Sequence, residues 1–445
     1  MARLAWFSPV PPVPTGVAAC TADAVGALGN AHAIDVFVDE PVVRQARGTL
    51  SAHEFVWRHQ QQPYDLTVYQ LGNSSHHDYE WPYLFRYPGL TVLHDAHLHH
   101  ARAAALLRTS RAGDYRIEFA VNHPDRSPDL AELAVAGFDN HLLYDWPMTR
   151  LVVQASRLTA VHGEPLARRL RDEIPGAEIR AIRLGQGEWL TMEAAADRGR
   201  RARERHGIPA DAMVFGCYGG LSPDKRVPQV LAAFAATLPY VPNAHLMLAG
   251  AAARHYDVAA DIARRGLHDR VTLTGYVSTD EAFTDAIAAC DVALTLRWPT
   301  AREISGPWLR CLAAGKPSVI IDLAHLGDVP TLDPRTWQPN LPPPRSTEPP
   351  CAISIDIVDE DHSLRLAMRR LGTDAQLRAS LGDAARRYWQ AAHSIEAMAD
   401  DYETLIADAV RRPSSNVSLP AHLRADGRAT LDRLLAPFGV ASPLQ

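Results

Sequence analysis

The chain lacks long apolar runs, paired cysteines and an excess of basic charge. No apolar run approaches the roughly 18 residues of a membrane-spanning helix, and the segment after Met1 lacks a signal peptide's long apolar core. The five cysteines form no CxxC pair, which favours buried thiols in a reducing compartment. The net charge of −6 gives no support for a nucleic-acid surface. We therefore expect a cytoplasmic protein that binds no nucleic acid and has at most peripheral contact with the inner face of the membrane.

Lysine is scarce, and the fingerprint of dinucleotide-binding enzymes is missing. Lys225 and Lys316 are the only lysines among the 45 basic residues. No G-x-G-x-x-G follows the opening strand of either half, so a nicotinamide-dependent dehydrogenase is not favoured.

What the chain does contain is an alternation of apolar strands and helices in both halves. In the first half we expect strands at residues 3–8, 34–38, 66–71, 90–93, 158–161 and 179–182. In the second half we expect them at residues 214–218, 245–249, 271–276, 292–296 and 318–321. A chain of 445 residues is too long for one ordinary core. The predicted fold class is therefore α/β, with two Rossmann-like doubly wound parallel sheets whose ligands bind at the carboxyl ends of the strands.

One loop between two predicted strands, within residues 296–317, has the chemistry of a phosphate site. Ser305 is a good N-cap for a short helix, and Pro307 fits its first turn. The free N–H groups of this turn point into the loop, and Gly306 has no side chain to block an approaching phosphate. Glu303 lies one step away and suits sugar or ribose hydroxyls. A phosphate cradle beside a carboxylate suggests a nucleotide-linked sugar.

A second loop, after the strand at 214–218, carries two glycines and two cations. Gly219 and Gly220 allow close approach of the backbone, and Lys225 and Arg226 supply positive charge to a diphosphate. Both loops follow strands of one parallel sheet, so they should meet at its carboxyl edge.

In the first half, four histidines occur in seven residues after the strand at 90–93. We favour no metal site, because no Glu or Cys is placed to complete a ligand set. The expectation is that His94 faces the cleft and bonds a sugar hydroxyl, while Asp95 orients it or caps the next helix. Gly16 either lets a ligand approach a helix N-terminus or simply ends a Pro-rich turn. His162 is interpreted as the plain start of a helix.

Four segments of the second half resemble a known family. They are similar to the nucleotide-sugar-binding domain of retaining GT-B glycosyltransferases of family four, in a subgroup marked by LR-x-PT-x-x-E-x-SG. The first half resembles the family more loosely, through SPVPPVPTGVA and TVLHDAHLHH. The four segments are YGGLSPDKRVPQVLAAF, HLMLAG, DRVTLTGYVSTDEA and ACDVALTLRWPTAREISGPWLRCLAAGKPSVI.

The resemblance implies retaining transfer of a sugar from a UDP- or GDP-sugar, usually without a metal or other cofactor. It implies that His94 faces the transferred sugar and that Glu303 binds the donor sugar. The acceptor could be a carbohydrate, a lipid-linked sugar or a small metabolite. The residues that the resemblance assigns to donor binding are Gly16, Gly219, Gly220, Lys225, Arg226, Ser305, Gly306 and Pro307.

The resemblance also implies a division of the chain. We expect an acceptor-binding domain at 1–187, a nucleotide-sugar-binding domain at 188–388, a closing helix at 389–411 and a partly flexible tail at 412–445. Within these, residues 110–150 read as an irregular insertion over the cleft, and residues 328–350 as a long surface loop.

The sequence departs from the family at three positions. Gly220 stands where the family often has Arg, and Arg226 could replace that charge. A second Glu, seven residues after the first, is absent; Arg310 or Cys311 stands there, which leaves ribose binding without a carboxylate. Arg302 replaces a smaller residue and either crowds or contacts the sugar. Because of these losses, a catalytically silent nucleotide-sugar-binding protein is the alternative. An isomerase or phosphorylase is third, and no lysine is well placed for pyridoxal phosphate.

Overall fold

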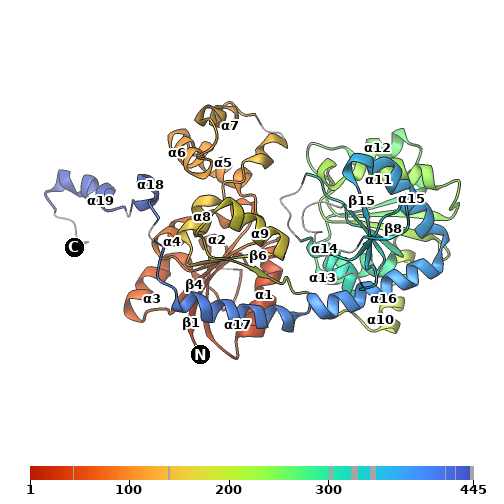
Figure 1. Cartoon of the computed structure of the whole chain (residues 1–445), viewed down its shortest axis with the longest axis horizontal. Helices are drawn as coiled ribbons and strands as arrows, with labels where there is room; N and C mark the ends of the chain where they lie inside the picture. Colours follow the sequence, from red (N-terminus) through yellow and green to blue (C-terminus); the bar gives the residue numbers. More distant parts are fainter. Residues whose placement is uncertain are drawn as a thin grey trace.

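Two parallel sheets, each with helices on both faces, make up the protein (Figure 1). The structure is a computed structural model, and the predicted doubly wound α/β class is confirmed. The residues that it describes are 1–43, 45–138, 141–299, 304–321, 329–340, 347–415, 417–425 and 427–440.

The first sheet has the strand order β3-β2-β1-β4-β5-β6-β7, and all its pairs are parallel. Its central strands are buried on both faces, which explains why they are continuous apolar runs. The short edge strand β3 was not predicted. The strands are β1 (Arg3–Phe7), β2 (Ala33–Val38), β3 (Leu50–Ser51), β4 (Leu66–Leu71), β5 (Leu90–Leu93), β6 (Leu158–His162) and β7 (Ile179–Ile182).

The second sheet has the order β10-β9-β8-β11-β12-β15-β13-β14 and is parallel except for the pair β13–β14. Its five predicted strands are confirmed within two residues at each end. The strands are β8 (Met213–Tyr218), β9 (Ala244–Ala249), β10 (Val271–Gly275), β11 (Val292–Leu294), β12 (Ser318–Ile321), β13 (Thr331–Leu332), β14 (Pro339–Asn340) and β15 (Ala352–Ile355).

Helices connect the strands and cover the sheets. In the first half they are α1 (Gly16–Leu28), α2 (Glu40–Val43), α3 (Phe55–Gln61), α4 (Trp81–Arg86), α5 (His99–Leu107), α6 (Ala112–Asn122), α7 (Ala131–Val135), α8 (Arg150–Ala155) and α9 (Glu164–Glu173). In the second half and tail they are α10 (Met192–Arg205), α11 (Val227–Thr237), α12 (Val258–Arg264), α13 (Asp280–Ala289), α14 (Gly306–Ala313), α15 (Glu360–Thr373), α16 (Ala375–Ala392), α17 (Ile395–Arg411), α18 (Ala421–Arg424) and α19 (Arg428–Leu435).

The last long helices join the two halves. Helix α16 packs on α14 of the second half, and α17 packs on α1 and on four strands of the first sheet, so the chain crosses back beneath both sheets (Figure 1). One apolar cluster accordingly contains Trp6 of β1, Trp308 of α14 and Tyr402 of α17. A cavity lined by Gly163 of the first half and by Trp308 marks the cleft between the halves. The domain boundary at 187/188 stays a prediction.

Two segments that were expected to be irregular contain regular elements. Residues 110–150 contain α6 and α7, and the buried Tyr115 and Phe119 of α6 pack with Ala131 and Ala134 of α7 in a cluster of their own. The expected surface loop at 328–350 contains the short strands β13 and β14, and residues 328 and 341–346 of it lie outside the described residues. All five cysteines are buried free thiols, as predicted. Among the described residues, no helix is long and apolar enough to cross a membrane.

Candidate functional site

The glycine loop after β8 lies close against the loop after β9. Gly219 has a φ of +93°, a conformation that favours glycine, and its N–H donates to the carbonyl of Ala249 at 3.0 Å. A Cβ at Gly250 would lie 1.8 Å from the carbonyl oxygen of Gly219, so glycine is required there as well. A Cβ at Gly220 would meet no atom within 4 Å. The loop therefore has open space at Gly220, where the family often has a side chain.

Helix α14 begins where the phosphate cradle was predicted. Ser305 is its N-cap and accepts a hydrogen bond from the N–H of Trp308, with Pro307 in the first turn. The indole N–H of Trp308 donates to Ser318 at 3.0 Å, which ties the helix start to β12. The free amides of this turn are thereby held at the carboxyl edge of the second sheet. Glu303 and Arg302 lie outside the described residues.

Lys225 and the start of α14 line one narrow pocket. Its walls include Gly220, Lys225, Arg297, Ser305 and Pro307. The two loops that form it are tied together, because the N–H of Trp298 donates to the carbonyl of Asp224 at 2.8 Å. The structure thus brings together a cation and helix-end amides that lie some eighty positions apart in the sequence.

The charge of Lys225 is set by its surroundings. Its pKa is lowered to about 7, chiefly by burial and to a smaller extent by Arg297, while Asp224 and Asp95 act in the opposite direction. Asp95 belongs to the first half, so both halves contribute to the electrostatics of this pocket. Sequence analysis missed Arg297, although it lies three residues after the end of β11, and the rule that sites form at the carboxyl ends of parallel strands would have found it.

Arg226 points elsewhere. Its backbone is left-handed, with a φ of +58°, and its side chain forms a two-pronged ion pair with Glu360 of α15, with an Nε–Oε1 distance of 2.7 Å. Its guanidinium also lies 5.5 Å from the ring centre of Trp298. The expectation that Arg226 replaces the missing loop charge is therefore not what this geometry favours.

Arg310 is also committed to protein partners. It forms an ion pair with Asp280 and lies 5.2 Å from the ring centre of Phe283. It also lowers the pKa of Asp23 on α1, in opposition to the larger effect of burial. Arg310 therefore belongs to a contact between α13, α14 and α1, not to the pocket around Lys225.

On the first half, His94 follows β5 and is held by two side chains. Its Nε2 lies 2.7 Å from the side-chain amide of Gln70, and its Nδ1 lies 3.2 Å from Nε2 of His162. The phenol of Tyr402, on α17, contacts the same amide at 3.1 Å. Both ring nitrogens of His94 are thus engaged, so a ring hydrogen bond to a sugar hydroxyl would require one of these contacts to break.

His162 is the last residue of β6 and not a plain helix start. Its Nδ1 lies 3.3 Å from the carbonyl oxygen of Ile182, and a carbonyl can only accept, so Nδ1 carries the proton. Burial lowers the pKa of both histidines, to about 4 for His162, so both rings are neutral near pH 7.

Asp95 takes neither of its two predicted roles. Its Oδ2 accepts from the N–H of Asn73 at 2.7 Å, whereas His94 has other partners and α5 has no side-chain cap. His97 bonds the carbonyl of Leu143, and His99 bonds the carbonyl of Trp146. Within the described part of the chain, no group of three or more His, Cys, Asp or Glu side chains is arranged to hold a metal.

Gly16 is the first residue of α1. Thr15 caps this helix by accepting from the N–H of Ala18, and a Cβ at Gly16 would meet no atom within 4 Å. The open space agrees with the expected room for a ligand, and the ligand contact itself stays a prediction.

The buried histidines predict a pH-dependent stability. The pKa of His162 is about 4 when folded and roughly 6.5 when unfolded. The unfolded chain therefore binds more protons below pH 6.5, and stability falls as the pH drops from 6.5 toward 4. Between pH 6.5 and 5, His162 should account for about 1.6 kcal/mol of this loss. Urea unfolding at several pH values measures it. We expect a shallower slope in His162→Gln, and an unchanged slope would contradict the assignment.

The comparison with sequence families gives one match. The family described as "Glycosyl transferases group 1" matches residues 212–332, the segment that contains both loops of the pocket. No curated protein matches the chain in sequence.

Solved structures of glycosyltransferases share the whole architecture. Sucrose-phosphate synthase from Thermosynechococcus elongatus has a TM-score of 0.61 at 15% identity, covering 92% of this chain and 98% of that one. Anabaena Alr3699/HepE in complex with UDP and glucose has a TM-score of 0.62 at 14% identity, covering 92% of this chain and 100% of that one. The catalytic domain of starch synthase IV from Arabidopsis thaliana, bound to ADP and acarbose, has a TM-score of 0.61 at 12% identity, covering 93% of this chain and 100% of that one. These similarities confirm the predicted GT-B fold.

Proposed function

We propose that the protein is a glycosyltransferase that moves a sugar from a nucleotide diphosphate sugar to an acceptor hydroxyl with retention of anomeric configuration. One observation carries the proposal: Lys225 and the N-terminus of α14 line a single pocket at the carboxyl edge of the second sheet, inside the segment that matches glycosyltransferases of group 1. A cation beside free helix amides is suited to a diphosphate.

In the proposed reaction, the bond between the sugar's anomeric carbon and the diphosphate oxygen breaks, and the acceptor oxygen attacks that carbon from the same face. The departing phosphate oxygen accepts the acceptor's proton. Lys225 and the amides at Ser305 and Gly306 stabilise the charge that develops on the diphosphate, and Arg297 adds to the positive potential. Glu303 would hold the donor sugar. The proposal needs no metal or other cofactor.

The donor and acceptor are proposed by class. UDP and GDP sugars are the expected donors; the solved structures with UDP and with ADP add ADP sugars to the panel. The acceptor is a carbohydrate, a lipid-linked sugar or a small metabolite, and we propose a cytoplasmic enzyme with at most peripheral membrane contact. The test is the release of nucleoside diphosphate from each sugar nucleotide, followed by NMR of the product's anomeric configuration. Release from none of the donors, with any acceptor class, would contradict transfer.

A catalytically silent sugar-nucleotide-binding protein is the second candidate. It is favoured by the ion pair of Arg226 with Glu360, which removes one of the two cations expected near the diphosphate. Saturable nucleotide binding without any release of product would support it.

A further inference from the structure

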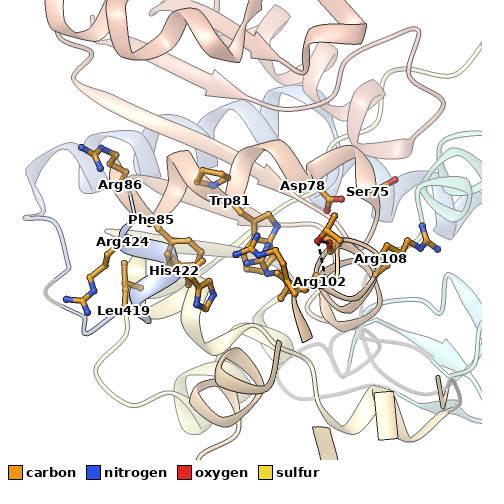
Figure 2. Close-up of a pocket in the computed structure, with 18 residues that line it drawn as sticks. Ser75, Asp78, Trp81, Phe85, Arg86, Arg102, Arg108, Leu419, His422 and Arg424 are labelled. Atoms are coloured by element: carbon orange, nitrogen blue, oxygen red, sulfur yellow. Dashed lines mark hydrogen bonds between the residues drawn. The ribbon is translucent and has the colours of Figure 1, made fainter. Parts of the chain in front are cut away.

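The C-terminal segment folds back over the first half and forms one wall of a cavity. Residues 417–425, which we call the strap, follow α17 and contain α18, which contacts α4. The cavity has a volume of about 750 Å³ and is also lined by α4 and α5. Figure 2 shows Leu419 and Arg424 of the strap at one end of the cavity and Ser75 and Asp78 at the other. A change in how the strap is held would therefore open or close this cavity.

Two kinds of contact hold the strap. Leu419 and Leu423 pack against the apolar core of the first half, and this packing carries no charge. His422 supplies polar contacts, and only 13% of its side chain is exposed. Its Nε2 lies 2.8 Å from Oε1 of Glu118, and its Nδ1 lies 3.4 Å from Oδ1 of Asp114. Both acidic side chains belong to α6, so His422 links the strap to that helix.

These two contacts require a particular protonation state of His422. A neutral imidazole has one N–H and one acceptor nitrogen, whereas an imidazolium has two N–H groups. Both ring nitrogens of His422 face carboxylate oxygens, and an ionised carboxylate can only accept. Burial acts to raise the pKa of Glu118, but hydrogen bonds from Arg102 and His422 bring it below its ordinary value, so this carboxylate is ionised. The bound strap therefore carries His422 as the imidazolium.

The rest of the first half can lose His422 without leaving an unpaired charge. Glu118 also accepts from Nε of Arg102 of α5 at 2.7 Å, and Asp114 also accepts from Nε of Arg111 at 2.7 Å. Breaking a buried ion pair is costly mainly when one charge stays buried without a partner. Because both carboxylates keep an arginine, the strap can detach at a smaller cost. The other charged side chains in the lining of the cavity, on the strap and on the elements that face it, are Arg86, Arg108, Arg424 and Asp78.

We propose that the strap is a pH-sensitive closure, which is held over the cavity while His422 is protonated and is released when His422 loses its proton. A neutral ring can donate to only one of the two carboxylates, and its other nitrogen then presents a lone pair to the second one. One charge-assisted contact is lost and one repulsive contact is gained, which leaves the apolar packing of Leu419 and Leu423. Release removes one wall of the cavity. The proposal does not depend on sugar transfer.

Electron paramagnetic resonance of the spin-labelled full chain tests the proposal. A nitroxide on Ala421→Cys, at an exposed position of α18, reports the mobility of the strap. The five native cysteines are buried, so they should stay unlabelled. We expect the mobile fraction of the label to rise several-fold between about pH 6 and pH 9, where a histidine loses its proton. A label on Gln376→Cys, exposed on α16, is the matched control and should show no change.

Substitutions in the labelled protein assign the pH dependence to one side chain. His422→Gln has no charge at any pH, so its label should be mobile throughout the range. His422→Arg keeps its charge, so its label should stay immobile at the highest pH. Asp78→Asn removes a cavity carboxylate whose pKa burial raises to about 6, and it should leave the pH dependence unchanged. A label whose mobility does not change with pH in the otherwise native chain, or the same pH dependence in His422→Gln, would overturn the proposal.

Discussion

Replacing Lys225 by Ala should lower kcat/KM for sugar transfer by about 10²–10³-fold, with little change in stability. The ammonium lies in the same pocket as the amides of α14, where it would face the charge that develops on the leaving diphosphate. Loss of one such preorganised donor typically costs this much. The ammonium of the half-buried Lys225 has no hydrogen bond within the described residues, so its removal leaves no unsatisfied partner there.

The pH dependence of nucleotide binding distinguishes this role from a packing role. With a pKa of about 7, Lys225 is increasingly neutral above pH 7 and must take up a proton to bind a diphosphate. Affinity should therefore fall as the pH rises, by up to roughly tenfold per unit. Lys225→Arg, which stays charged, should lose this dependence. A kcat/KM within about threefold of wild type in Lys225→Ala would contradict the assignment.

Replacing Arg226 by Ala should destabilise the fold by about 3–5 kcal/mol, because the Glu360 carboxylate is left buried without its partner. The two side chains are only 15% and 8% exposed. Unfolding in urea measures the loss, and the fraction that stays folded should still bind nucleotide. In a double-mutant cycle with Glu360→Ala, the free energy of unfolding lost in the double variant should be much smaller than the sum of the losses in the two single variants.

The matched control for this pair is Arg365→Ala. It breaks the exposed pair with Asp361, and such pairs contribute less than about 1 kcal/mol. If Arg226→Ala were no more destabilising than this control but abolished nucleotide binding, Arg226 would be a diphosphate ligand, as the sequence alone suggests.

The parallel sheets could be predicted from the sequence because their strands are buried on both faces. β4 has six buried residues in a row, and such a run between loops is a strong signal. The helices of the segment 110–150 were not predicted, because some of the side chains that they bury are charged. Its α6 carries the buried Glu118, paired with Arg102 of α5, and a buried ion pair looks in the sequence like a solvent-exposed surface.

The pocket was predictable in part. Lys225 and Ser305 follow strands of one parallel sheet. Because the carboxyl ends of such strands meet at one edge, the sequence placed the two residues together. Arg226 follows Lys225 directly, yet its left-handed backbone turns the side chain toward Glu360, which no residue pattern shows. The engagement of His94 by Gln70 and His162 depends on strand neighbours from distant parts of the chain. Glu303 stays a prediction.

Thermal unfolding with UDP, GDP, ADP and their sugars, in wild type and in Lys225→Ala, tests the central claim most directly. A ligand that binds only the folded state stabilises it, by about 2.7 kcal/mol at 100 times its Kd. We predict that at least one nucleotide raises the unfolding temperature of the wild type and that this shift is lost in Lys225→Ala. No shift with any nucleotide, or an equal shift in both proteins, would contradict a sugar-nucleotide site between Lys225 and α14.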